Sequence, residues 1–215
     1  MHFKRTLVAM AALLLTTACS AQSANQPNPP YTNGDQYVTI SSPQRYSDQG
    51  KVEVVEVFSY GCIHCAHFAP YMEKLRQSLP DDVAVHYIPA DFNRQWEPYA
   101  RAFYAAKQLG VVKSTHLAVF KAKFDEKYPM NSLQDFANFY ARHGVDPDAF
   151  LKAAHSARTD QQLARNNRLI QQWKIMGTPA IVVDGKYRSA HIENFEQLVA
   201  MTKWLVQREL KAKQH

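Results

Sequence analysis

The chain has 215 residues, of which 46% are hydrophobic, and this composition excludes a largely disordered protein. It is long enough to bury one sizeable core, with room for a small second subdomain. The formal net charge is +6 at neutral pH, but no basic stripe with interleaved aromatic residues marks a nucleic-acid-binding surface, so we expect no nucleic-acid partner.

The N-terminus has the pattern of an export signal. Lys4 and Arg5 precede an apolar stretch, residues 6–18, that is shorter than the about 20 residues needed to cross a bilayer. We therefore expect residues 1–18 to be a signal peptide and the protein to leave the cytoplasm.

The end of this stretch is compatible with two processing sites. The run "LLTTACS" resembles a bacterial lipoprotein signal, and this resemblance implies that cleavage leaves Cys19 as an acylated first residue. Thr16 stands where such signals usually carry leucine, and an ordinary cleavage before Gln22 is the alternative. Residues 19–36 are polar and rich in proline, asparagine and serine, as in a flexible tether or a frayed mature N-terminus.

The first regular elements predict a strand, a helix and a second strand. Residues 52–58 form a β-branched run that is typical of a strand buried on both faces. Apolar residues then recur at helical spacing from Cys62 until Pro80, and residues 83–88 alternate as in a second strand. A crossover of this length predicts a parallel strand pair with a right-handed connection.

The middle of the chain, from about residue 91 to 165, is almost entirely helical in pattern. Its own apolar residues suffice for a small core, so we expect an inserted all-helical subdomain whose last helix, residues 160–173, runs back to the sheet. Glycines predict helix ends at Gly110 and Gly144. Capping side chains or first-turn prolines predict helix starts, in this block and after it, at Pro98, Ser132, Asp146, Thr159 and Asn194.

The closing half of the sheet follows the helical block. Residues 180–183 read as a strand, and Asp184 with Gly185 is a strong two-residue hairpin turn. We therefore expect an α/β fold in which residues 37–90 and residues 166–215 form one domain around the helical insertion.

Two cysteines with two residues between them lie where the first strand meets the helix. We expect Cys62 to be exposed at the helix N-terminus among free backbone N–H groups, and Cys65 to face the helix interior. Only a thiolate is nucleophilic, so stabilisation of the Cys62 anion sets both its reactivity and the redox potential of the pair. The helix dipole lowers the pKa by about one unit, and the backbone N–H groups of His64 and Cys65, with the protonated His64 imidazole, are candidate donors.

Other uses of the cysteine pair remain to be considered. A c-type haem would need a histidine directly after the second cysteine, where the chain has Ala66. A zinc site could combine Cys62 and Cys65 with His64 or His67, although no second ligand pair with zinc-like spacing follows. We expect no metal, but a tethered metal-binding module and a pair of inert buried thiols stay open as alternatives.

Glu56 interrupts the first buried strand, on the same face as Val54 and Phe58. One interpretation is an edge-exposed or ion-paired carboxylate. The other is a buried carboxyl, with a pKa raised by burial, that accepts or relays the proton of Cys65 during thiol exchange.

The segments "GCIHCAHFAP" and "MGTPAIVVDG", with the β-branched strand before the first, resemble the thioredoxin superfamily. The helical block narrows the resemblance to the DsbA family of periplasmic thiol:disulfide oxidoreductases. In that family a proline that kinks the active-site helix stands at the place of Pro70, a histidine precedes the second cysteine as His64 does, and a buried glutamate corresponds to Glu56. Ile63 replaces the proline of the family's usual dipeptide, and this departure bears on the degree of oxidising power but not on the class of reaction.

This resemblance also implies a substrate site. The Thr178–Pro179 peptide bond is implied to be cis, to lie beside the disulfide and to pair its backbone with an extended substrate; a trans proline that opens the strand is the alternative. We expect Thr178 and Ile63 to contact the substrate.

The activity implied by the resemblance is donation of the Cys62–Cys65 disulfide to newly exported, unfolded polypeptides through a mixed disulfide. No cofactor besides this disulfide is implied, and a membrane partner of the DsbB type would reoxidise the pair. We expect a periplasmic monomer that touches the membrane only through an acylated Cys19. A disulfide isomerase or reductase is the alternative within this class, because isomerases also carry threonine before the cis proline.

Overall fold

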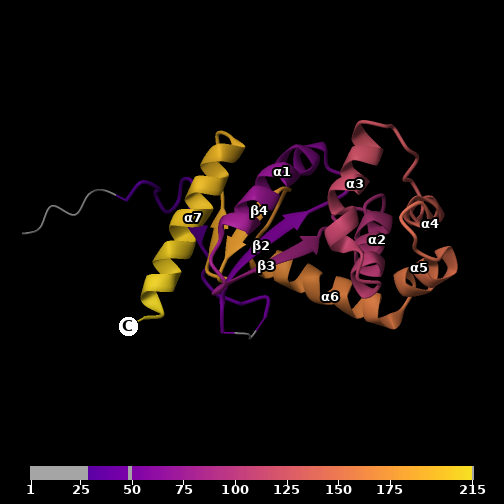
Figure 1. Ribbon diagram of the computed structural model, residues 1–215. Helices are drawn as coiled ribbons and strands as arrows, with labels where there is room; N and C mark the ends of the chain where they lie inside the picture. Colours follow the sequence, from indigo (N-terminus) through magenta and orange to yellow (C-terminus); the bar gives the residue numbers. More distant parts are fainter. Residues whose placement is uncertain (1–28, 48–49, 215) are drawn as a thin grey trace, which may run out of the picture. The chain divides into compact units, whose positions relative to one another are not determined.

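The structure is a computed structural model that describes residues 29–47 and 50–214. The predicted signal peptide, most of the predicted tether and Cys19 lie outside the described residues. From Tyr31 onward the chain is built around a five-stranded mixed sheet with the strand order β1-β5-β4-β2-β3 (Figure 1). The strands are β1 (Tyr37–Thr39), β2 (Val52–Phe58), β3 (Val83–Pro89), β4 (Ala180–Val183) and β5 (Tyr187–Ser189).

Strand β2 lies between β3 and β4, and all of its residues are buried, as the β-branched run predicts. It pairs parallel with β3, which confirms the predicted crossover, and antiparallel with β4. The hairpin between β4 and β5 turns at Asp184 and Gly185, with φ values of 50° and 64°. Both values are positive, as a two-residue turn of this kind requires.

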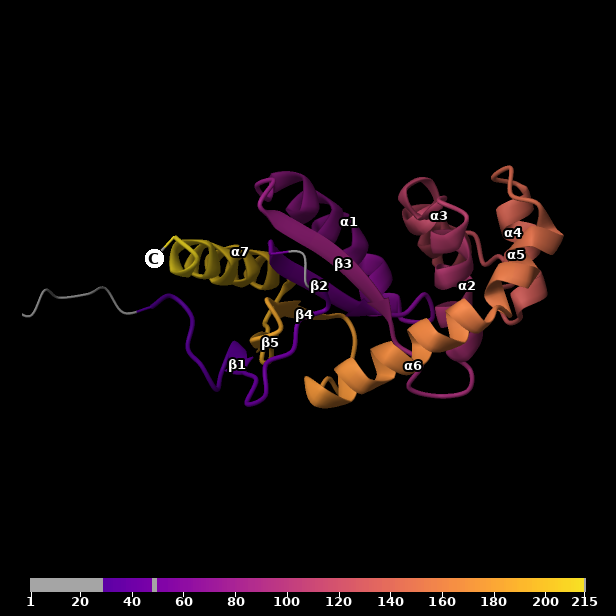
Figure 2. The same cartoon turned by 90° about the horizontal axis from the view of Figure 1, so that it is seen from below.

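Helices cover both faces of the sheet (Figures 1 and 2). Helices α1 and α7 pack on the face that carries Val54, whereas α6 packs on the opposite face against Val55 and Val57. No helix in the described part of the chain has the length and hydrophobicity to cross a membrane. The helices are α1 (Ile63–Ser78), α2 (Glu97–Gln108), α3 (Val112–Phe124), α4 (Leu133–Ala141), α5 (Pro147–Ala154), α6 (Ala157–Gln172) and α7 (Phe195–Ala212).

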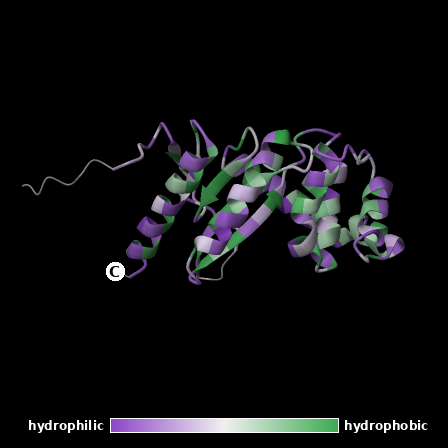
Figure 3. Ribbon diagram, turned by 45° about the horizontal axis from the view of Figure 1, so that its top comes forward, coloured by the Kyte–Doolittle hydropathy of each residue, from purple (hydrophilic) through white to green (hydrophobic). Residues whose placement is uncertain are grey.

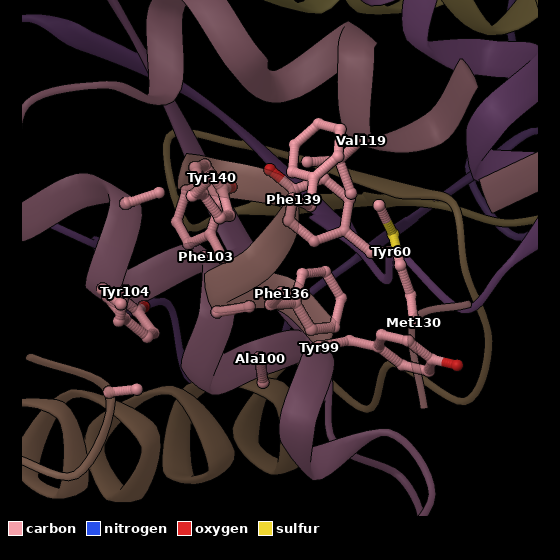
Figure 4. Close-up of a cluster of buried hydrophobic side chains, with 14 of the residues drawn as sticks. Tyr60, Tyr99, Ala100, Phe103, Tyr104, Val119, Met130, Phe136, Phe139 and Tyr140 are labelled. Atoms are coloured by element: carbon pink, nitrogen blue, oxygen red, sulfur yellow. The ribbon is translucent and has the colours of Figure 1, made fainter. Parts of the chain in front are cut away.

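Helices α2 to α5 are inserted between β3 and α6 and lie together beyond one end of β2 (Figure 1). Their apolar side chains form an aromatic cluster that includes Phe103, Phe136 and Tyr140 (Figure 4). The ring of Phe103 lies 5.3 Å from that of Phe58 at the end of β2, so this cluster packs directly on the sheet. Hydrophobic residues dominate β2, whereas hydrophobic and hydrophilic residues alternate along the helices (Figure 3).

Most of the predicted helix starts are confirmed. Ser132 forms a capping box with Asp135, and the side chains of Asp146 and Asn194 each accept a backbone hydrogen bond at a helix start. The predicted start at Thr159 is wrong. Helix α6 begins at Ala157 because Ser156 provides the cap, while the Thr159 hydroxyl bonds to the Ala153 carbonyl instead.

Candidate active site

The end of β2 and the start of α1 present the cysteine pair. In the turn between them, the Gly61 N–H donates to the Ser59 hydroxyl at 3.0 Å, and the Cys62 N–H donates to the Ser59 carbonyl at 3.0 Å. Cys62 is the N-cap of α1, and its Sγ accepts the Cys65 N–H at 3.4 Å. The first cysteine therefore satisfies one of the free donors at the helix N-terminus.

Both cysteines are free thiols in this structure. Cys65 is fully buried, which confirms the prediction that it faces inward. The prediction that Cys62 is exposed is wrong, because only 8% of its surface is accessible. The loop before β4 covers it, and the Cys62 thiol donates to the Thr178 carbonyl at 3.4 Å. A contact between residues this far apart in the chain cannot be read from a local pattern.

The two sulfurs differ strongly in acidity. A hydrogen bond from the Cys65 thiol, with further donors at the Thr178 side chain and at the backbone of Cys65 and His64, outweighs burial and lowers the Cys62 pKa to about 5. Burial, together with the hydrogen bond to Cys62, raises the pKa of Cys65 far above its usual range. Cys62 is therefore the thiolate of the reduced pair at neutral pH, and Cys65 keeps its proton.

The Thr178 hydroxyl has a role that depends on this ionisation. It is buried and has no hydrogen-bond partner among the described residues while Cys62 is a thiol that donates to the Thr178 carbonyl. Once Cys62 is an anion, the hydroxyl becomes one of the donors that lower its pKa.

The side chains between the two cysteines point outward. Ile63 is 40% exposed, and the His64 side chain is exposed as well. The His64 backbone N–H is among the groups that lower the pKa of Cys62, whereas its imidazole makes no hydrogen bond to Cys62. The imidazole is thus free to meet a partner bonded at Cys62.

Glu56 is buried in β2, with 1% of its surface exposed. Its Oε2 atom has no hydrogen-bond partner among the described residues, so the edge-exposed or ion-paired interpretation is wrong. Burial, and secondarily the negative charge of Cys62, raises the pKa of Glu56 to about 8. The carboxyl is therefore protonated at neutral pH and close enough to the cysteines to sense their charge.

The Thr178–Pro179 peptide bond is cis, as the resemblance implies, and it lies beside Cys62. A cavity of about 490 Å³ opens on this side of the pair, and we call it the Thr178 groove. It is lined by His64, Thr178, Pro179 and the start of α7, including Phe195. Both the exposed imidazole and the proline loop therefore face the same open space.

Two features of strand β2 and of the turn that follows it were not predicted from the sequence. The ring of Tyr99 in α2 packs on Gly61, so closely that a Cβ atom at this glycine would lie 2.6 Å from Cε2 of the ring. No local pattern signals this contact, because the two residues belong to different parts of the fold.

The second such feature is Glu53, which is fully buried at the start of β2. Although burial opposes its ionisation, the nearby His86 ring, whose Nε2 lies 3.6 Å from Oε1, hydrogen bonds from Ser47 and Tyr46 and the charge of Arg45 lower its pKa to about 2. The same strand therefore carries one buried carboxylate that is charged and one buried carboxyl, Glu56, that is neutral. The signal in the sequence was a second glutamate within the β-branched run.

The described part of the chain contains no cluster of side chains that could bind a metal ion. Across residues 29–47 and 50–214, no group of three His, Cys, Asp or Glu side chains lies close enough to hold an ion.

Comparisons with known proteins agree with the geometry. A family model described as "Thioredoxin" matches residues 47–201. The chain is 36% identical to the thiol:disulfide interchange protein DsbA of Pseudomonas aeruginosa over 182 residues, which cover 85% of this chain and 84% of that protein. It is 37% identical to the DsbA of Azotobacter vinelandii over 155 residues, which cover 72% of each.

Solved structures show the same similarity in three dimensions. The crystal structure of the oxidoreductase DsbA from Xylella fastidiosa matches with a TM-score of 0.81 and 34% identity, over 84% of this chain and 98% of that one. The DsbA of Pseudomonas aeruginosa matches with the same TM-score and identity, over 86% and 97%. The chain therefore belongs to the DsbA family of thiol:disulfide oxidoreductases, with a thioredoxin-like fold that carries a helical insertion.

Proposed function

We propose that Cys62 and Cys65 are the redox centre through which this protein donates a disulfide to newly exported polypeptides. The supporting observation is the asymmetry of the pair. Cys62 caps α1 with a pKa of about 5, and Cys65 is buried with a raised pKa. A stable Cys62 thiolate favours the reduced protein, and hence makes the Cys62–Cys65 disulfide oxidising.

The first step is attack by a substrate thiolate on Sγ of Cys62. The substrate–Cys62 bond forms while the Cys62–Cys65 bond breaks, and Cys65 leaves with the electron pair. Because the Cys65 thiol has a raised pKa, its anion needs a proton at once. The protonated carboxyl of Glu56 supplies it in this proposal.

In the second step, another substrate thiolate attacks the substrate sulfur of the mixed disulfide. The Cys62 thiolate leaves, and the low pKa makes it a good leaving group. The substrate has lost two electrons and gained a disulfide. The protein has accepted these two electrons, so both Cys62 and Cys65 are reduced. A membrane partner of the DsbB type would accept these electrons and restore the Cys62–Cys65 disulfide.

The substrate-facing groups are Ile63, His64, Thr178 and Pro179. Ile63 and His64 are exposed beside Cys62, and the proline loop borders the Thr178 groove. An extended, unfolded chain is the partner that such an open surface of mixed polarity favours, because backbone pairing and apolar contacts bind it with little sequence preference. We propose that the Thr178 backbone pairs with this chain.

The cellular setting follows from the N-terminal pattern of the chain. The export signal supports action in the periplasm. We further propose that the protein acts as a monomer and that an acylated Cys19 anchors it to the membrane. The redox-active disulfide itself is the only cofactor in this proposal.

The direct test is oxidation of a reduced, unfolded protein by the purified, oxidised chain. We expect stoichiometric disulfide transfer, and we expect Cys62→Ser to abolish it. Retention of this activity in Cys62→Ser would exclude the proposal. Reactivation of a scrambled, fully oxidised substrate would instead favour the isomerase, and one equivalent of tightly held zinc without thiol exchange would favour the metal-binding module.

A further inference from the structure

A second depression borders the cysteine pair, on the side away from the Thr178 groove. It lies between the first two turns of α1 and helix α3 and has a volume of about 520 Å³. We call it the α1–α3 trough. Its apolar lining includes Ile63, Ala66, Pro70, Leu117, Phe120 and Phe124.

The rim of this trough holds two unusually exposed apolar side chains. In the described part of the chain, four large hydrophobic residues are exposed. Two of them, Ile63 at 40% and Leu117 at 45%, lie on opposite walls of the trough, one from α1 and the other from α3. Exposed apolar side chains that gather around a depression mark a binding surface more often than single ones do.

The trough begins at the redox centre. Ile63 lines the trough, whereas the next residue, His64, lines the Thr178 groove. Cys62 directly precedes both residues as the N-cap of α1. The first turn of α1 therefore separates two depressions, and a polypeptide bonded to Cys62 has one of them on either side.

The length of the trough sets the size of its occupant. From Ile63 to Pro70 the helix rises about 10 Å, at about 1.5 Å per residue. An extended chain covers the same length with about three residues, at about 3.3 Å each. The far end carries Lys121 and Asp125, which have opposite charges, so the trough offers no preference for a charged segment.

We propose that the α1–α3 trough binds an apolar segment of about three residues of the substrate polypeptide, on the opposite side of its reactive cysteine from the segment in the Thr178 groove. This inference rests on the proposed role of Cys62. The mixed disulfide delivers the substrate to the mouth of the trough, so even weak apolar contacts there stabilise the bound chain.

The test compares mixed disulfides of different peptides at Cys62. The Cys65→Ala variant has no second thiol that could resolve the mixed disulfide at Cys62. Glutathione bonded to Cys62 can therefore exchange with a single-cysteine peptide until equilibrium is reached. Three peptides are used, with three leucines on the N-terminal side of the cysteine, with three leucines on its C-terminal side, or with serines on both sides. Each peptide is tested with the protein that keeps Leu117 and with the Leu117→Glu variant.

We expect Leu117→Glu to lower the exchange constant about tenfold for one of the two leucine peptides, and to leave the serine peptide unchanged. Leu117→Met should behave as the parent does. Ser114→Glu places the same charge at an exposed position of α3 outside the trough, and it should change none of the constants.

Unchanged constants for both leucine peptides in Leu117→Glu would overturn the inference, as would an equal loss for the serine peptide. Either result, with normal glutathione exchange at Cys62, leaves the proposed function intact. Absence of any mixed disulfide at Cys62 would contradict the proposed function itself and the inference with it.

Discussion

The ring of Tyr99 lies against Gly61, the residue that precedes Cys62, and leaves no room for a side chain there. Lys123 also contacts this ring, because its Nζ donates to the Tyr99 hydroxyl at 2.9 Å and lies 4.7 Å from the ring centre. Tyr99 belongs to α2 and Lys123 to α3. The helical insertion therefore supports the turn that presents the first cysteine.

Replacement of Gly61 by alanine should move this turn. An added Cβ would force the Tyr99 ring or the Gly61 backbone to shift, at a cost of about 1–3 kcal/mol in the free energy of unfolding. The shift should lengthen the 3.4 Å contact from the Cys65 N–H to Cys62 and raise the Cys62 pKa. Chemical denaturation and thiolate absorbance measure the two effects.

The matched control is Gly177→Ala, also beside the redox centre. A Cβ at Gly177 meets no atom within 4 Å, so stability and the Cys62 pKa should stay close to those of the parent. Equal behaviour of the two variants would show that the contact with Tyr99 does not position Cys62.

The acidity of Cys62 should depend on a donor at position 65. The hydrogen bond from the Cys65 thiol is the largest cause of the lowered pKa. In the reduced protein, Cys65→Ala should therefore raise the thiolate midpoint from about 5 by more than one unit. Cys65→Ser keeps a donor and should stay nearer the parent value, and identical midpoints in the two variants would rule out this cause.

The reduced protein should lose stability relative to the oxidised protein as the pH falls. The Cys62 pKa is about 5 in the folded chain, against 9.0 for an unperturbed thiol. A lowered pKa gives stability that is complete above the unfolded value and is lost as the pH falls through the folded value. The unfolding free energy of the reduced protein minus that of the oxidised protein should therefore decrease as the pH falls from about 9 to about 5. A flat difference across this range would contradict the lowered pKa.

Glu56 should oppose folding at neutral pH. Its folded pKa is about 8 and its unperturbed value 4.5, so the stability that its neutral form provides is complete below 4.5 and is lost as the pH rises to about 8. Glu56→Gln should stabilise the reduced protein at pH 7 by up to roughly 3 kcal/mol and flatten this dependence. It should also slow the release of Cys65 during mixed-disulfide formation, because the proton source is gone. Stopped-flow fluorescence and denaturation curves test the two expectations.

A glutamate on the same strand provides the contrasting variant. Glu53 has a lowered pKa because its charge is hydrogen-bonded, so Glu53→Gln should destabilise the protein at pH 7 by about 2–3 kcal/mol. A stability change of the same sign in both variants would contradict the assignment of one neutral and one charged carboxyl.

Much of the fold follows from local patterns. The buried strand β2, the parallel crossover to β3, the Asp184–Gly185 turn and the caps at Ser132 and Asn194 each depend on residues close together in the chain. The start of α6, in contrast, does not follow from the local pattern. Two hydroxyl side chains, Ser156 and Thr159, lie within one turn, and only the contacts of Thr159 with α2 and α5 decide which of them caps the helix.

The sequence by itself determined where the reactive pair lies, since a cysteine that follows a buried strand and begins a helix must meet the free N–H groups of that helix. Only the tertiary structure shows that the Thr178 loop covers Cys62, that the His64 imidazole is exposed without a hydrogen bond to Cys62, and that Glu56 is neutral while Glu53 is charged. Exposure and pKa depend on which groups surround a side chain in space, and these groups come from other segments of the chain: Thr178 lies 116 residues from Cys62, and His86 belongs to the strand beside Glu53.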